Sequence, residues 1–229
     1  MNMTLDELKA RAKQDLDNAF EKGKSQGGGG NDVATYMVVR DNQWAAVAFP
    51  EGYDFVLSLK TTPQTFNNVL VNATGVKTAT IICETEAAIV WTGLVRNCTV
   101  EVLDLTKCKL SPKDISYFAL NNAKIVSVLG VIDMSNCTAA TLAFSSATAL
   151  EDISFKESTI GISIAFNNCL LLSAESLHSI MMGLSPTVTG QTLTLPKYAT
   201  CKATYDAVYG DGAWDILAAS KTNWTIAYS

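Results

Sequence analysis

A four-residue box recurs along the middle of the chain, and this repeat limits the possible folds more than any other feature. Each box contains an apolar residue, a variable residue, Asn or Ser, and a small residue. Its four copies begin 25, 24 and 22 residues apart and occupy residues 95–98, 120–123, 144–147 and 166–169. Repeats of this length predict a solenoid, because each unit buries its apolar face only against its neighbours.

A second pattern follows the first, and a slip of one residue is allowed between the two. It reads apolar-x-x-apolar-x-apolar-x-x-small, which predicts a short strand with alternate side chains pointing inward. Its members are Val100, Leu103, Leu105 and Cys108, then Leu129, Ile132, Met134 and Cys137, then Leu150, Ile153, Phe155 and Ser158. Small residues let coils approach closely, so we interpret four cysteines as buried structural thiols: Cys98, Cys108, Cys137 and Cys169.

These two patterns resemble the BspA-like leucine-rich repeats, whose units carry an aromatic-x-Asn-Cys box followed by a Leu-x-x-Ile-x-Leu strand. The clearest matches are residues 166–171 and 98–105, and the resemblance covers about half the chain. It implies an α+β repeat solenoid that is leucine-rich-repeat-like. The closing segments look like those of repeat proteins from bacteriophages and gut bacteria. The resemblance therefore implies a virion or surface component that binds proteins or a host surface.

An amphipathic helix is expected before the repeats. Thr4-Leu5-Asp6-Glu7 has the form of a capping box, and an apolar stripe follows it at helical spacing. Four consecutive glycines then form a flexible linker. The helix therefore either attaches the chain to a partner or to further copies of itself, or folds back onto its own domain. The stripe consists of Leu5, Leu8, Ala12, Leu16 and Phe20.

Five segments follow from these features. We expect a helix over 1–26, a glycine linker over 27–31, a β-rich N-terminal cap over 32–75, the solenoid over 76–196 and a mixed C-terminal cap over 197–229. In the first cap, the β-rich runs 35–40, 44–49 and 55–60 predict an antiparallel meander.

Helix and strand signals are also clear towards the C-terminus. Ser173 is placed to cap a helix that buries Leu177, Ile180, Met181 and Leu184. A strand through Leu193 and Leu195 is expected next. Helical stretches near 199–208 and 213–219 follow, and then a final strand that begins at Trp224.

The amino-acid composition argues against several classes of function. Seventeen Lys and Arg against 22 Asp and Glu give a net charge of −5, which argues against nucleic-acid binding. With a single histidine, His178, and no Cys-x-x-Cys motif, we expect no metal site, no cofactor and no enzyme. The N-terminus lacks the pattern of a secretory signal, and no segment is apolar enough to span a membrane. Nothing in the sequence therefore directs export, and the resemblance to repeat proteins from bacteriophages implies a virion assembled in the host cytoplasm.

Six polar residues on the expected strands form the candidate partner-binding patch. They are Asp104, Thr106, Asp133, Ser135, Ser154 and Lys156. Asp104 and Asp133 are expected at the same place in successive strands. The alternative is a solvated face that only keeps the repeat soluble.

The sequence thus predicts a non-enzymatic, protein-binding repeat protein, a head or tail fibre or decoration component of a bacteriophage, which forms homo-oligomers through its N-terminal helix. Its partners would be virion proteins, itself, or a host-surface protein or glycan. A bacterial surface adhesin or glycan-binding module is the alternative. A depolymerase that uses Asp104 and Asp133 is a third hypothesis.

Overall fold

The structure is a computed structural model that describes residues 48–59, 70, 73–83, 89–108 and 111–229. The expected N-terminal helix, the glycine linker and the β-rich segment up to residue 47 lie outside the described residues. The attachment role of Leu5, Leu8, Ala12, Leu16 and Phe20 therefore stays a prediction.

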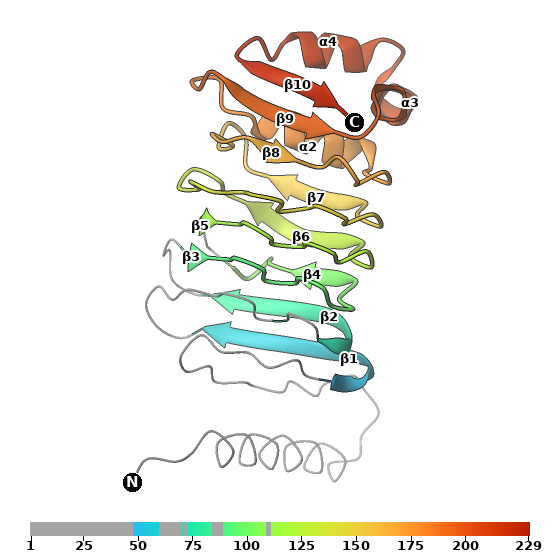
Figure 1. Ribbon diagram of the computed structural model, residues 1–229. Helices are drawn as coiled ribbons and strands as arrows, with labels where there is room; N and C mark the ends of the chain where they lie inside the picture. The colour runs from blue at the N-terminus through green and yellow to red at the C-terminus, as the bar shows by residue number, and fades with distance from the viewer. Residues whose placement is uncertain (1–47, 60–69, 71–72, 84–88, 109–110) are drawn as a thin grey trace, which may run out of the picture.

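The chain winds into a parallel β-solenoid of about five turns with few helices, as expected for a repeat solenoid (Figure 1). Its largest sheet has the order β1-β2-β4-β6-β7, with all neighbours parallel. The bounds of these strands are Ala48–Leu59, Thr74–Cys83, Val102–Asp104, Ser127–Ile132 and Asp152–Phe155.

Two shorter parallel sheets form another side of the solenoid (Figure 1). One pairs β3 (Ile89–Val90) with β5 (Pro112–Asp114). The other has the order β10-β9-β8 and consists of Trp224–Tyr228, Gln191–Leu195 and Ile164–Ala165. The helices are α2 (Ala174–Gly183), α3 (Tyr198–Tyr209) and α4 (Ala213–Ala219).

A column of aromatic rings runs through the core from coil to coil. Trp91 and Phe118 have centroids 5.9 Å apart, Phe118 and Phe144 are 5.7 Å apart, and Phe144 stacks on Phe166 at 4.7 Å. The three phenylalanines have no exposed surface. Contacts at these separations are favourable beyond the burial of apolar area, so the column links four successive coils.

The second box lies one residue earlier in the structure than the sequence pattern indicates. Asn97, Asn121 and Ser146 share a left-handed backbone conformation at φ 56, 56 and 69°. This places Asn122, and not Ala123, in line with Cys98. Asn122 is fully buried and donates to the Val100 carbonyl of the preceding coil at 3.1 Å, while Ala123 is exposed. The slip arose because two consecutive asparagines fit the box in either register.

The second copy of the strand pattern predicts a buried Leu129, and this prediction is wrong. Its side chain is 42% exposed, and the inward positions of that coil belong instead to Ile125 and Val128. The physical reason is a bulge in β6. Ser127 pairs with Asp152 and Val131 pairs with Ser154, so β6 has two more residues than β7 between the same partners.

Strand β1 differs from the expected meander. It is continuous through residues 50–54, where a turn was predicted, and its register with β2 is irregular on both sides of Tyr53. Strand β1 pairs with β2 in parallel. The proline and glycine that suggested a turn therefore lie in an irregular part of a strand, which tolerates both residue types.

The C-terminal helices lie where the sequence predicts them. Ser173 caps α2 by accepting the Ser176 N–H, and the four apolar residues expected to face inward are all buried: Leu177, Ile180, Met181 and Leu184. Helix α2 also covers the edge of β7. The Ile153 N–H donates to the Ser176 hydroxyl at 2.9 Å, and the Phe155 N–H donates to the Ser179 hydroxyl at 2.8 Å.

Candidate functional site

The bulge in β6 exposes two apolar side chains on the outer face of the five-stranded sheet. Leu129 is 42% exposed and Val131 is 63% exposed. Gly130, between them, has φ +98°, and a Cβ there would lie 2.9 Å from the Leu105 carbonyl carbon. Only glycine fits this position without strain, so the close packing of Gly130 on Leu105 maintains the bulge.

Five of the six residues of the predicted polar patch form the polar surroundings of this bulge. Lys156 forms a 2.6 Å ion pair with Asp133, and the Ser135 N–H donates to Asp133 at 2.9 Å. Ser154 pairs with Val131 in the sheet, and Asp104 pairs with Leu129. The expectation that Asp104 and Asp133 share one strand position is therefore wrong, because Asp104 pairs with Leu129, four residues before Asp133.

Asp104 instead forms a local turn with the sixth predicted residue, Thr106. Both the N–H and the hydroxyl of Thr106 donate to Asp104 Oδ1, at 2.9 and 2.6 Å. The same turn recurs at Asp133 and Ser135. Within the described part of the chain, no hydrogen bond or ion pair connects Asp104 to Asp133 or Lys156, so the patch consists of two separate polar groups on either side of the apolar pair.

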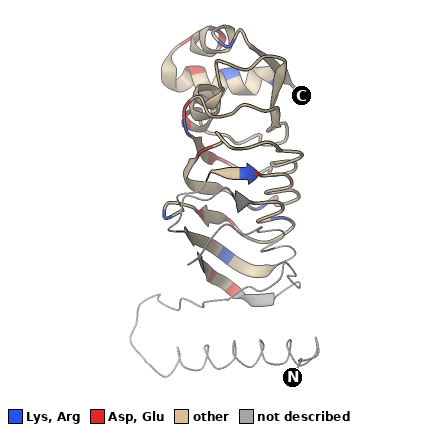
Figure 2. Cartoon of the chain, turned by 90° about the vertical axis from the view of Figure 1, so that its left-hand side faces the viewer, with Lys and Arg blue, Asp and Glu red and all other residues tan. Residues whose placement is uncertain are grey.

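Two aspartates and one lysine give the patch a formal charge of −1, and the lysine is paired with Asp133. Burial acts to raise the pKa of the Asp133 carboxyl, but hydrogen bonds from Lys156 and Ser135 outweigh it and hold that pKa below its usual value. The contact with Lys156 therefore favours the ionised form of the Asp133 carboxyl. Charged residues are sparse along the solenoid more generally (Figure 2).

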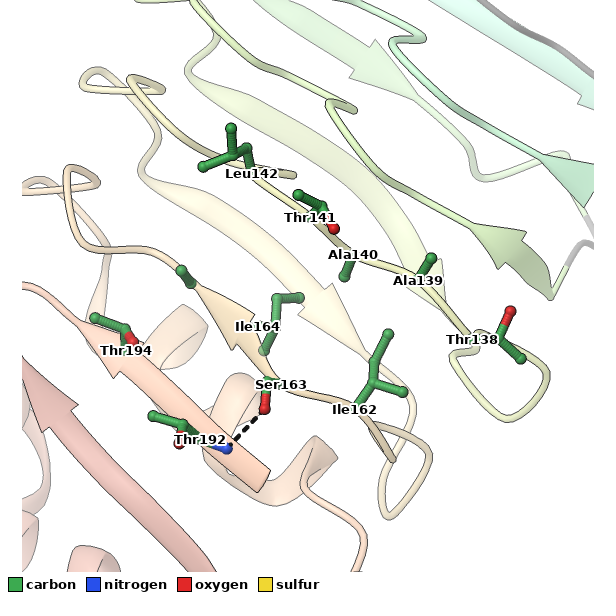
Figure 3. Close-up of a pocket in the computed structure, with 11 residues that line it drawn as sticks. Thr138, Ala139, Ala140, Thr141, Leu142, Ile162, Ser163, Ile164, Thr192 and Thr194 are labelled. Carbon is green, nitrogen blue, oxygen red and sulfur yellow. Dashed lines mark hydrogen bonds between the residues drawn. The ribbon is translucent and has the colours of Figure 1, made fainter. Parts of the chain in front are cut away.

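A groove of about 430 Å³ lies on another side of the solenoid, between the coil that holds residues 138–142 and the strands β8 and β9 (Figure 3). None of the described residues that line it is charged. Its walls consist of Thr138, Ala139, Ala140, Thr141, Leu142, Ile162, Ser163, Ile164, Ala165, Thr192 and Thr194.

The groove coincides with a break in the hydrogen-bonded ladder. The N–H groups of Ile115 and Tyr117 donate to the carbonyls of Ala139 and Thr141, so this coil pairs with the coil before it. Strand β8 pairs with β9 on its other side. Within residues 111–229, no backbone hydrogen bond connects residues 139–142 with β8. No sequence pattern signals this break, because both coils carry the repeat.

The single histidine takes part in an aromatic cluster. His178 Nδ1 lies 2.7 Å from the Tyr205 hydroxyl, and the His178 ring stacks on that of Tyr209 with centroids 5.2 Å apart. Burial raises the pKa of Tyr205. No serine or cysteine hydrogen-bonds to His178 among the described residues, so the contacts of this histidine are those of a packing residue.

The acidic residues near the C-terminus connect α3 to α4. Lys202 bridges Asp206 at 2.6 Å and Asp215 at 2.9 Å. Asp206 also accepts the N–H groups of Gly212 and Trp214, at the start of α4. The hydrogen bond from Lys202 is the largest of the effects that lower the pKa of Asp206. In the described ranges, no group of three or more His, Cys, Asp or Glu is placed to hold a metal ion.

Burial suppresses the reactivity of the thiols. It raises the pKa of Cys98 to about 11 and that of Cys169 to about 12. The nucleophilic form of cysteine is the thiolate, so both thiols are inert near neutral pH. Cys98, Cys137 and Cys169 are buried and free, as expected for structural thiols, whereas Cys108 is only partly buried.

Comparison of the chain with protein-family models, with curated proteins and with solved structures finds no match. Of the helices within the described ranges, none has the length and apolarity needed to cross a bilayer. The features that bear on function are therefore the repeat pattern and the two surfaces described above.

Proposed function

We propose that this chain is a non-enzymatic, protein-binding repeat protein that serves as a structural component of a bacteriophage head or tail. Its units would be leucine-rich-repeat-like, with the terminal segments as caps. The N-terminal helix would attach the solenoid to the particle or to further copies of itself. The virion assignment depends on the resemblance of the repeats to the BspA-like family.

The exposed apolar pair on the β6 bulge is the observation that supports binding. Leu129 and Val131 are surrounded by polar groups, with the Asp133–Lys156 ion pair on one side and Asp104 on the other. An apolar centre inside a polar rim is the usual anatomy of a protein interface. A bulge held by a glycine under steric constraint is a built feature of a sheet and not a random irregularity.

The chemistry of the described residues supports a binding role over catalysis. The buried thiols have raised pKa values, and His178 is engaged with Tyr205 and Tyr209. The two carboxylates proposed for a depolymerase, Asp104 and Asp133, belong to separate turns. These arrangements supply no nucleophile paired with a general base.

Particle incorporation tests this function. The tagged full chain is expressed in its source cell, particles are isolated on a density gradient, and the chain is detected by immunoblotting. Wild type and Ile216→Glu are expected in the particles, since Ile216 is 74% exposed on α4 but lies outside the bulge. A chain without residues 1–26 is expected to be absent because it lacks the attaching helix, and Val131→Glu is expected to be absent because the bulge would contact a neighbouring virion protein and make incorporation stable.

The outcomes separate the parts of the proposal. Absence of the wild-type chain from all particles would refute the virion role. Incorporation of Val131→Glu at the wild-type level would refute the role of the bulge. Binding of wild type, but not Val131→Glu, to a glycan array would support the adhesin alternative instead.

A further inference from the structure

We propose that the groove between residues 138–142 and β8 binds an extended, uncharged peptide segment of another protein by strand addition. This surface is separate from the β6 bulge, so the proposal goes beyond the function given above. Among the described residues, main-chain groups without partners face the groove, and its walls are uncharged.

The wall at Ala140 offers a backbone donor. Ala139 bridges to Asp114 of the preceding coil, and its carbonyl accepts the Ile115 N–H. Main-chain groups of successive residues in an extended segment point to opposite edges. The Ala140 N–H therefore points toward the groove, and in the described part of the chain it has no hydrogen-bond acceptor.

The wall at Ala165 offers both a donor and an acceptor. The Phe166 N–H donates to the Thr194 carbonyl, so the main chain of Phe166 faces β9. By the same alternation, the N–H and C=O of Ala165 face the groove, and neither bonds to another described backbone group. Unpaired ladder groups on an edge are the template that an added strand recognises.

The cause of the gap lies in the turn that follows β7. The Ser158 N–H donates to the Met182 carbonyl and the Ile160 N–H donates to the Gly183 carbonyl. The chain after β7 is therefore hydrogen-bonded to the end of α2. It continues into β8, which pairs with β9, and the side that faces residues 138–142 stays unbonded (Figure 3).

The residues that line the groove determine which side chains a bound segment can carry. Ala139, Ala140 and Ala165 are small, which lets another backbone approach closely. No charged residue lines the groove, and a buried charge without a partner is costly, so the bound stretch carries no charge.

The first test is selection from a displayed library of random 12-residue peptides against the full chain. Selected peptides are expected to contain an uncharged stretch rich in β-branched residues and to bind wild type and Thr148→Arg equally. Thr148 is exposed and does not line the groove. Binding to Ala165→Arg is expected to be at least tenfold weaker, because the new side chain fills and charges the groove. Circular dichroism and thermal melting confirm that both variants fold.

N-methylation of a selected peptide tests the strand geometry. Methyl groups on alternate backbone nitrogens are expected to lower affinity at least tenfold, while those on the intervening nitrogens leave it unchanged, because only every second N–H of a strand faces a given edge. Amide hydrogen exchange supplies a second readout. The amides of Ala140 and Ala165 should exchange faster than those of Tyr117 and Phe166, and should slow on peptide binding.

Four results would overturn the proposal. These are a selection without enriched peptides, equal binding to wild type and Ala165→Arg, N-methyl effects without alternation, and slow exchange of Ala140 and Ala165 in the free chain. The last result would mean that the two coils are already paired. Particle incorporation of Val131→Glu is unaffected by any of them, so failure here is distinguishable from failure of the proposed function.

Discussion

Replacement of Asn122 by alanine tests the repeat register. Its side-chain amide donates to the Val100 carbonyl at 3.1 Å, and its Oδ1 accepts the Lys124 N–H at 3.2 Å. Asn122 is fully buried, so water cannot replace the lost donor. A hydrogen bond contributes about 1 kcal/mol net, and a buried acceptor left without a partner costs about 1–3 kcal/mol. Asn122→Ala should therefore lower the free energy of unfolding by about 2–4 kcal/mol.

Ala123 provides the matched control. Its side chain is exposed, so Ala123→Gln should change the free energy of unfolding by less than about 0.5 kcal/mol. Urea unfolding followed by circular dichroism measures both variants. With a slope of about 2 kcal/mol per molar urea, the midpoint should fall by about 1–2 M for Asn122→Ala and stay constant for Ala123→Gln.

The two registers give opposite results in this experiment. If the second coil followed the sequence box, Ala123 would lie in the buried column, and glutamine there would destabilise the chain strongly. A large loss for Ala123→Gln together with a small one for Asn122→Ala would refute the assignment of Asn122 to the column of Cys98.

Three further outcomes are expected. Gly130→Ala should destabilise by about 1–3 kcal/mol in urea unfolding, since its φ is +98° and the new Cβ would meet the Leu105 carbonyl; a neutral effect would contradict the packed bulge. Cys169, with a pKa of about 12, should react with a thiol reagent at pH 8 only after unfolding, and rapid labelling of the native chain would contradict its burial. Lys202→Met should be less stable than wild type at pH 7. Because Lys202 lowers the pKa of Asp206 below 3.8, the difference in urea midpoint should persist above that pH and shrink as the pH falls through the folded-state pKa. A difference that is constant from pH 7 to 2 would exclude the ion pair as its cause.

Sequence reasoning worked where one physical signal dominated. The spacing of Phe144 and Phe166 identifies the core column, because large buried side chains recur once per coil. Helix α2 was predictable because Ser173 supplies a clear cap. The register of the second coil was ambiguous because Asn121 and Asn122 are identical, and only backbone conformation distinguishes them.

The two candidate surfaces were harder to predict. The sequence predicts polar residues around Asp133, but its apolar periodicity places Leu129 in the core, because periodicity does not reveal a bulge. The single available signal was Gly130 inside an apolar run. The groove depends on the turn after β7 pairing with α2 and β8 pairing with β9, which is a tertiary choice that no local pattern encodes.

The serine hydroxyls on α2 determine how long the five-stranded sheet can become. A parallel sheet grows whenever its last strand offers free N–H groups to another chain, but Ser176 and Ser179 already accept those of Ile153 and Phe155. Helix α2 therefore ends the sheet at β7, because its hydroxyls occupy the N–H groups that a further strand would need. Solenoids of this kind can therefore be produced at high concentration without this edge seeding fibres.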